Sequence, residues 1–503
     1  MKKIIDRNRD TFIFVILLIL ITCLGGFLRF YQIGKLSFWI DEAATAFDIQ
    51  GDFKTFVDRL NSLANMRFYY ILAYFWTKLF PNASDGTLRA LSAIFSTATI
   101  PVVFLLGKEM AADKPKANTL GLVAAFLTAI NAFHVQYAQE FRSYSLTLLL
   151  TLLSTLMLIK LFESEETKTK WVIWYVLITA AAVYSHMHAV FILAAHAASL
   201  LVLLSDKQKI LRKLPTFLLS CLAIAVLLTP MAITALQKGA ILKWISAPTL
   251  ATINRFFVSI SGYKGNALII LFLLFGLVGF LFGSGLLLRQ ELVYKWKIFL
   301  ITFSFLLPIL IAFIISAAIT PIFVNRYLMY VIPYMTILTA YGILVPAFIR
   351  ENIKITRFIT MPIMIVIFSV FTLFASKGLV QYYDSFRKEE WRQVADLLTT
   401  KCSDSYRIYY PEWIGQGVLY YNPILESQTN PFINYQNSGD LGDDKSSHSI
   451  FQSEEQVCLV LSHIKTRQIR VEESEEIKKS LEQEYSNVDT YKYYEVVVEI
   501  YSN

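Results

Sequence analysis

The chain is poor in charge for its length. Of its 503 residues only 17% are charged, whereas 55% are hydrophobic and 15% are aromatic. A soluble domain is about 45–50% apolar even when glycine is counted. The excess here is concentrated in runs of about 20 residues, the length that a helix needs to cross about 30 Å of hydrocarbon. The composition therefore excludes an ordinary soluble protein and predicts a polytopic α-helical membrane protein. The net charge of +8 does not indicate a nucleic-acid partner, because it is expected mainly on cytoplasmic loops.

Cysteine is also scarce, and none of the spacings among the four resembles a zinc site. Cys23 and Cys221 lie inside apolar runs and are interpreted as small hydrophobic residues. Cys402 and Cys458 lie in the polar C-terminal part, where an oxidising compartment would be compatible with a disulfide. Their separation in sequence does not say whether the side chains meet, so their pairing stays open.

Basic loops predict how the chain crosses the membrane. Lysines and arginines precede the apolar run 11–30, which is too long for a cleaved signal sequence, so we expect a retained anchor with a cytoplasmic N-terminus. Residues 66–80 are apolar but short, which favours an interfacial or re-entrant helix. If they do not cross, every later cytoplasmic loop carries at least two Lys or Arg. The external loop 237–265 is the exception, because it is basic too. About 11 spans follow, over residues 11–30, 88–107, 119–133, 143–161, 171–184, 189–204, 214–236, 266–288, 298–320, 326–349 and 358–376.

Two domains are predicted. Residues 1–376 form the transmembrane domain, and its external loop 31–87 carries interfacial helices, one of them amphipathic over 51–65. Residues 377–503 are polar and rich in tyrosine, and we expect a small external α/β domain of about 120 residues. Its predicted elements are helices at 390–400 and 472–485, strands at 406–410, 456–462 and 490–501, and a turn-rich loop at 427–449.

Two adjacent carboxylates, Asp41 and Glu42, follow the first apolar run at the level of the lipid head groups. Carboxylates near apolar surroundings are costly unless they are paired or used. Desolvation and a charged neighbour can tune such a group into a general base. The alternative is the solvated start of a loop.

Arginines on the outer face run against the usual charge bias. Arg67, Arg142 and Arg326 each lie at the mouth of a predicted span or re-entrant helix. An anionic partner explains them, since the planar guanidinium suits phosphate. Alternatively they pair with Glu42, Glu140 and Asp48. Other polar residues predicted on this face are Asn65, His134, Gln139 and His186, whereas His188 and His196 are expected to be satisfied within helices.

The order of these motifs resembles the GT-C glycosyltransferases of the protein O-mannosyltransferase and aminoarabinose-transferase type, over roughly residues 10–400. The matching segments are Trp39-Ile40-Asp41-Glu42-Ala43, Asn65-Met66-Arg67-Phe68-Tyr69-Tyr70, Leu88-Arg89-Ala90-Leu91-Ser92, Gln139-Glu140-Phe141-Arg142-Ser143-Tyr144, Tyr184-Ser185-His186, Arg326-Tyr327-Leu328 and Trp391-Arg392. One segment departs from the pattern. Many relatives have His-Pro-Pro-Leu-Tyr-Tyr where this chain has Asn65 to Tyr70, which leaves the acceptor class open.

The resemblance implies transfer of a sugar, mannosyltransferase-like, from a polyprenyl-phosphate donor by a single inverting displacement. Asp41 would be the general base. Glu42 and Glu140 would complete the catalytic set, with Glu140 orienting a substrate. The implied substrate-binding residues are Asn65, Arg67, Tyr70, His134, Gln139, Arg142, Tyr144, His186 and Arg326, with Arg142 and Arg326 on the phosphate. Because a lipid phosphate already leaves well, no metal cofactor is required, although a divalent metal ion stays open.

The alternatives belong to other classes. A transporter or lipid flippase would show paired repeats and charges at mid-depth in its spans, and neither is seen in the sequence. An inactive membrane scaffold would be expected to lose Asp41, which is present. Short cytoplasmic loops and the lack of a eukaryotic retention tail favour a bacterial plasma (inner) membrane. The sugar, the acceptor (protein, glycolipid or polymer) and the oligomeric state stay open.

Overall fold

The computed structural model describes residues 2–164, 169–238, 245–262, 265–287, 290–353, 357–428, 455–464 and 468–503. The chain divides into two compact units. The first comprises Met1–Ile33, Val57–Ala83 and Thr87–Ser385, and the second comprises Gly34–Phe56, Ser84–Gly86 and Phe386–Asn503. The segment around Asp41 therefore belongs to the same unit as the C-terminal residues.

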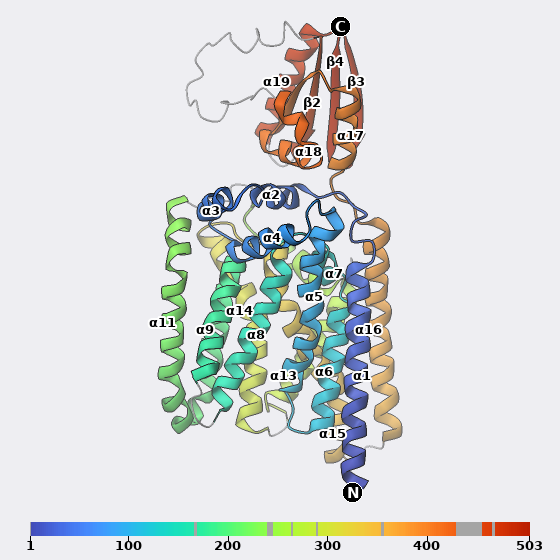
Figure 1. Ribbon diagram of the computed structural model, residues 1–503. Helices are drawn as coiled ribbons and strands as arrows, with labels where there is room; N and C mark the ends of the chain where they lie inside the picture. The colour runs from blue at the N-terminus through green and yellow to red at the C-terminus, as the bar shows by residue number, and fades with distance from the viewer. Residues whose placement is uncertain are drawn as a thin grey trace. The chain divides into compact units, whose positions relative to one another are not determined.

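The first unit is a bundle of long helices (Figure 1). Its α-helices are α1 (Lys2–Phe30), α4 (Arg67–Leu79), α5 (Asp85–Lys108), α6 (Lys114–Ala129), α7 (Ala132–Ala138), α8 (Tyr144–Glu163), α9 (Thr169–Ser185), α10 (Phe191–Ser199), α11 (Lys207–Lys238), α12 (Leu250–Ser261), α13 (Asn266–Gly283), α14 (Leu292–Ala318), α15 (Ile332–Ile353) and α16 (Arg357–Ser385). Three 3-10 segments interrupt them: η1 (Met187–Val190), η2 (Leu200–Ser205) and η3 (Asn325–Val331). Helix α3 (Phe53–Ser62) begins in the second unit and ends in the first.

Nine helical segments among the described residues are long and apolar enough to cross a membrane, or ten if the bent pair α6 and α7 forms one span. Helix α9, with 17 residues, is one residue shorter than the shortest of the nine, which has 18. The predicted polytopic architecture of about 11 spans is consistent with these helices. Helix α4 has only 13 residues and runs across the ends of the long helices (Figure 1), as predicted for residues 66–80.

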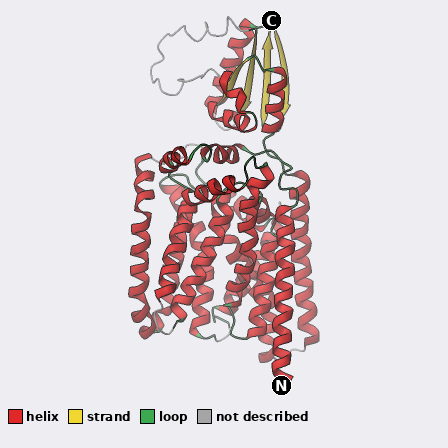
Figure 2. Ribbon diagram, viewed as in Figure 1, coloured by secondary structure: helices red, strands yellow, loops and turns green. Residues whose placement is uncertain are grey.

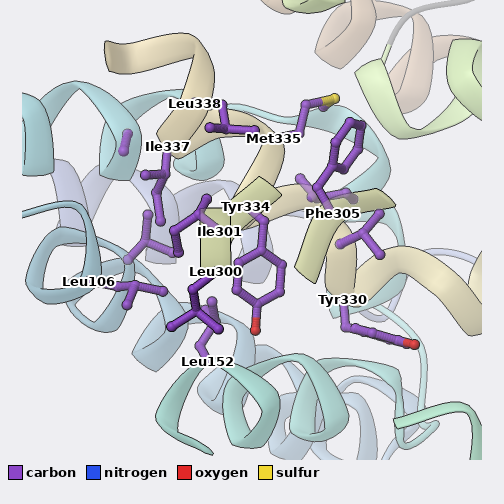
Figure 3. Close-up of a cluster of buried hydrophobic side chains, with 14 of the residues drawn as sticks. Leu106, Leu152, Leu300, Ile301, Phe305, Tyr330, Tyr334, Met335, Ile337 and Leu338 are labelled. Atoms are coloured by element: carbon purple, nitrogen blue, oxygen red, sulfur yellow. The ribbon is translucent and has the colours of Figure 1, made fainter. Parts of the chain in front are cut away.

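Helix α15 is the centre of the bundle. The most apolar stretch of its segment, residues 328–345, is completely buried, whereas the most apolar stretches of α1 and α16 are 11% and 17% buried. Figure 3 shows Tyr334 of α15 among leucine and isoleucine side chains of α8 and α14. Its hydroxyl lies 2.8 Å from Thr155 Oγ1, so this buried polar atom is satisfied. Helices α13 and α15 approach closely at Gly279, where a Cβ atom would collide with the carbonyl oxygen of Leu338.

A buried arginine stabilises the break between α6 and α7, where the chain bends by 63°. Arg29 is fully buried in α1, and among the described residues its guanidinium has hydrogen bonds to Ser96, to His134 and to backbone carbonyls. Its Nη1 donates to the carbonyl oxygens of Gly25 and Ala129 at 2.8 and 3.0 Å. The carbonyls at the end of α6 have no partner within their own helix. Arg29 therefore takes up backbone groups that the bend leaves free.

An ion-pair network closes the opposite end of the bundle. Lys297 of α14 is nearly fully buried and pairs with Glu109, at 2.9 Å, and with Glu163 of α8. Lys160 pairs with the same Glu109 at 2.6 Å. Because a buried charge is costly alone, this network holds α8, α14 and the segment after α5 in one arrangement.

The second unit contains all of the strands in the described chain (Figure 2). Strands β1 (Tyr406–Tyr410), β2 (Gln456–Ser462), β4 (Val496–Ser502) and β3 (Asn487–Tyr493) form one sheet in that order. Strand β1 is parallel to β2, and the other pairs are antiparallel. The helices are α2 (Ile40–Asp48), α17 (Trp391–Lys401), α18 (Gly415–Tyr421) and α19 (Gln468–Glu484), with 3-10 turns η4 (Glu412–Ile414) and η5 (Pro423–Gln428).

The structure of the second unit corrects one prediction and answers one open question. Residues 490–501, predicted as one strand, belong to two strands of a hairpin. The chain reverses at Glu495, whose φ of +60° lies in the left-handed region, and no Gly, Pro or Asn marks this turn. Cys402 and Cys458 form a disulfide that joins α17 to β2. The predicted loop 427–449 falls almost wholly outside the described residues.

Candidate functional site

The residues predicted for the site fall in both units. Asp41 and Glu42 belong to the second unit, and the other ten belong to the first.

Asp41 and Glu42 occupy the first turn of α2. Negative charge is favourable there, because the helix dipole places partial positive charge at its N-terminus. Asp41 is half-buried, whereas Glu42 is fully buried and pairs with Lys388 at 2.8 Å. The two neighbouring carboxylates therefore differ. Glu42 is committed to an ion pair inside the unit, and Asp41 is more accessible.

A second acidic group in this unit is Asp85. Its carboxylate accepts hydrogen bonds from Arg392 at 2.7 Å and from the Tyr421 hydroxyl at 2.6 Å. Burial alone would lower the pKa of Arg392, but the hydrogen bond and the charge of Asp85 outweigh it and raise this pKa. Burial and the charge of Asp85 likewise raise the pKa of Tyr421. These residues thus form a stable polar cluster of charged and hydrogen-bonded groups.

Four of the predicted residues of the first unit gather at the ends of its helices. Arg326 Nε donates to the Tyr144 hydroxyl at 3.1 Å. The imidazole of His186 lies 5.9 Å from the Tyr144 ring, centroid to centroid. Burial, the neighbouring His188, and the positive charges of Arg142 and Arg326 hold the pKa of His186 well below its usual range. We call Arg142, Tyr144, His186 and Arg326 the basic cluster.

Among the buried polar atoms in and beside the basic cluster, two that have no hydrogen-bond partner among the described residues bear on ligand binding. They are Nε2 of His186 and Oγ of Ser143, and both side chains are at most 2% exposed. Buried polar atoms are nearly always paired. An unpaired imidazole nitrogen near the positive charges of Arg142 and Arg326 is suited to bind an anion, and the unpaired hydroxyl of Ser143 belongs to the residue directly after Arg142.

The remaining predicted residues of the first unit take part in its packing. Arg67 donates to backbone carbonyls and to Thr234 of α11 at 2.7 Å. His134 lies between Arg29 and Ser96, with contacts of 2.9 and 3.0 Å. Gln139 joins the end of α1 to Tyr382 of α16. Asn65 accepts from the Met187 amide at 3.0 Å. Tyr70 and Glu140 are buried.

Sequence reasoning missed four residues that the structure makes prominent: Arg29, Ser143, Lys388 and Glu389. Arg29 carried a signal, because it is a charge inside the apolar run 11–30. Lys388 and Glu389 did not stand out in a polar region. Among the described residues no group of three or more His, Cys, Asp or Glu is placed to hold a metal ion.

Solved structures share this fold. ArnT from Cupriavidus metallidurans, an aminoarabinose transferase, matches in its apo state with a TM-score of 0.59 and 10% identity, over 96% of this chain and 97% of that one. The same protein bound to undecaprenyl phosphate matches with a TM-score of 0.57 and 9% identity over the same shares. The oligosaccharyltransferase AglB from Archaeoglobus fulgidus, with an inhibitory peptide and a dolichol-phosphate, matches with a TM-score of 0.51 and 13% identity, over 89% of this chain and 69% of that one.

Both proteins are GT-C glycosyltransferases, so the predicted resemblance and the predicted fold class are confirmed at the level of the fold. No family model matches the sequence, and no curated protein matches it significantly. The chain is thus a multi-pass membrane protein with a GT-C-like fold.

Proposed function

We propose that the chain is a membrane glycosyltransferase that moves a sugar from a polyprenyl-phosphate donor to an acceptor at the outer face of the membrane. The observation that carries this proposal is the basic cluster, with the unpaired nitrogen of His186 beside Arg142 and Arg326. A phosphate diester offers oxygens to all of these donors. The crystal structure of ArnT with undecaprenyl phosphate, on a similar fold, supports the choice of lipid.

Asp41 is assigned the role of general base. Its carboxylate takes the proton from the acceptor hydroxyl while that oxygen attacks the anomeric carbon. The bond from this carbon to the phosphate oxygen breaks, and its electron pair leaves with the lipid phosphate. The configuration at the anomeric carbon is inverted. Arg142 and Arg326 stabilise the charge that develops on the phosphate. Glu140 orients a substrate hydroxyl, and Glu42 supports Asp41 through its ion pair with Lys388.

An outer-face reaction is supported by charge and by chemistry. Cytoplasmic placement of the basic loops puts the segment after α1 outside. The disulfide between Cys402 and Cys458 is typical of an oxidising compartment. Both arguments assign the same side to the second unit.

The test uses undecaprenyl phosphate as the probe and the purified chain in lipid nanodiscs. We expect saturable binding that undecaprenol, which lacks the phosphate, does not compete for. His186→Phe keeps a ring beside Tyr327, whose centroid lies 4.6 Å from that of His186. It removes the donor, so affinity should fall by about 10–150-fold, the range for a hydrogen bond to a charged group. Equal binding of the two lipids would refute the phosphate site.

Mass spectrometry of envelope lipids, glycans and proteins, with and without the gene, then identifies the product. The expected result is a glycosylated species that disappears with the gene and returns on complementation. Transport of an unmodified lipid, with no such species, would favour the flippase alternative.

A further inference from the structure

The residue before helix α2, which bears Asp41, provides no side-chain cap. Helices usually begin after Ser, Thr, Asp or Asn, whose side chain accepts from a free backbone amide. Here the preceding residue is Trp39, which offers no acceptor. The first amides of α2 therefore require acceptors from elsewhere.

Glu389 supplies one of them from 349 residues away in the sequence. Its Oε2 accepts from the Ile40 amide at 2.7 Å and from Trp391 Nε1 at 2.6 Å. Its Oε1 lies 2.8 Å from Nε2 of His463, directly after β2. Two hydrogen bonds therefore fix Oε2 of this buried carboxylate, and the residue that it caps, Ile40, is the immediate neighbour of Asp41.

Lys388 fixes the other side of Asp41. Its ammonium lies 2.8 Å from Glu42 Oε2, and the two side chains are 5% and 0% exposed. The same carboxylate oxygen accepts from the Trp39 amide at 3.4 Å. A buried carboxylate left without its cation would be strongly destabilised. Glu42 thus keeps its place only while Lys388 is present.

The segment before α2 is held by the same part of the chain. The Tyr421 hydroxyl accepts from the Phe38 amide at 2.7 Å. The rings of Phe38 and Tyr420 stack with centroids 4.8 Å apart. Residues on both sides of Asp41 therefore contact Lys388, Glu389 and the end of α18.

We infer that Lys388 and Glu389 are positioning residues that fix the helix bearing Asp41 in the geometry needed for proton transfer. This inference rests on the proposed function, because it takes Asp41 as the base. It gives the C-terminal part of the second unit a role in the reaction without contact to the reacting atoms. A base displaced by about 1 Å can cost about 100-fold in rate.

The experiment combines hydrogen–deuterium exchange of the full chain with product formation in cells. Glu389→Gln and Lys388→Met should each raise exchange in the peptide spanning 39–48 at least tenfold. Strands β2 and β4 should stay protected, which shows that the unit is folded. Product formation should fall at least tenfold, while affinity for undecaprenyl phosphate stays within twofold of wild type.

Matched controls are adjacent in the sequence. Glu390 accepts from the Tyr494 amide and not from α2, and Arg387 is exposed. Glu390→Gln and Arg387→Met should therefore leave exchange in 39–48 unchanged. Lys388→Arg, which keeps the charge, should retain most of the product. The double variant Glu42→Gln/Lys388→Met should be no worse than the worse single variant, because the two residues act as a pair.

Unchanged exchange in 39–48 for both Glu389→Gln and Lys388→Met would overturn the inference. Faster exchange with wild-type product formation would overturn it too, because Asp41 would then need no such support. If one of these two variants unfolds the second unit, the result for the other variant decides whether the inference holds. If no product depends on the gene in wild type, the proposed function fails. The exchange data still decide whether Lys388 and Glu389 hold α2.

Discussion

The acidic segment around Asp41 and the basic cluster are held in place in different ways. Helix α2 is held by hydrogen bonds and an ion pair to side chains 346–383 residues away. The basic cluster is held mainly by the packing of rings at the ends of α8, α9 and η3. Single polar substitutions should therefore loosen the first without affecting the second. The two regions should also separate in function, with turnover depending on one and donor binding on the other.

Asp41→Asn should have the largest effect. It keeps the size of the side chain and removes its basicity, so turnover should fall by about 10²–10⁴-fold, the usual contribution of a general base. Affinity for undecaprenyl phosphate should stay unchanged. Asp48→Asn, at the other end of the same helix, is the control. Full product formation by the Asp41→Asn variant would end the assignment of this base.

Removing the disulfide is expected to act on the second unit alone. The double variant Cys402→Ser/Cys458→Ser should lower the free energy of unfolding of this unit by about 2–4 kcal/mol, since the open chain gains conformational freedom when unfolded. Denaturation followed by exchange in β2 and β4 measures it. If undecaprenyl phosphate binding fell as well, the proposed separation of the two regions would be wrong.

Arg142→Ala and Arg326→Ala should weaken binding of undecaprenyl phosphate by about 10–150-fold each, because each removes charge-assisted hydrogen bonds. Arg255→Ala is the control, since Arg255 is an exposed arginine on α12. Unchanged affinity in both variants would remove the basic cluster from the phosphate site, while leaving the case for Asp41 as it stands.

The smallest expected effect is seen in the chemical labelling of introduced cysteines. This labelling tests on which side of the membrane each segment lies. The free cysteines Cys23 and Cys221 are first replaced by serine. In intact cells a membrane-impermeant maleimide should then label a cysteine at Lys479, which is exposed on α19, and not one at Lys114 at the start of α6. The reverse pattern would mean that α4 crosses the membrane or that the basic-loop argument is wrong.

Periodicity and charge predicted the elements that depend on local sequence. The strands at 406–410 and 456–462 have the predicted bounds, and α17 is displaced by a single residue. Helix-end residues such as Arg142 and Arg326 could be grouped because consecutive spans return to the same face. The hairpin at 490–501 was missed because its turn at Glu495 lacks the usual turn residues.

Long-range partners could not be predicted. Nothing in the sequence around Trp39 says that the missing cap comes from Glu389, and nothing around Arg67 says that it bonds to Thr234. Such pairs depend on how distant segments meet, which a single sequence does not record. The contacts of His134 with Arg29 and of Gln139 with the end of α1 are likewise long-range, and the sequence did not predict them.

The contacts of Arg29 also bear on how the protein is made. Its carbonyl acceptors at the end of α6 lie 99 and 100 residues later in the chain. At a synthesis rate of about 5–20 residues per second, these acceptors emerge from the ribosome about 5–20 s after Arg29 does. Until then the first helix lies in the membrane with a charged group in its last turn, where the side chain can reach the interface. The final position of α1 in the bundle is therefore fixed only after α6 has been inserted.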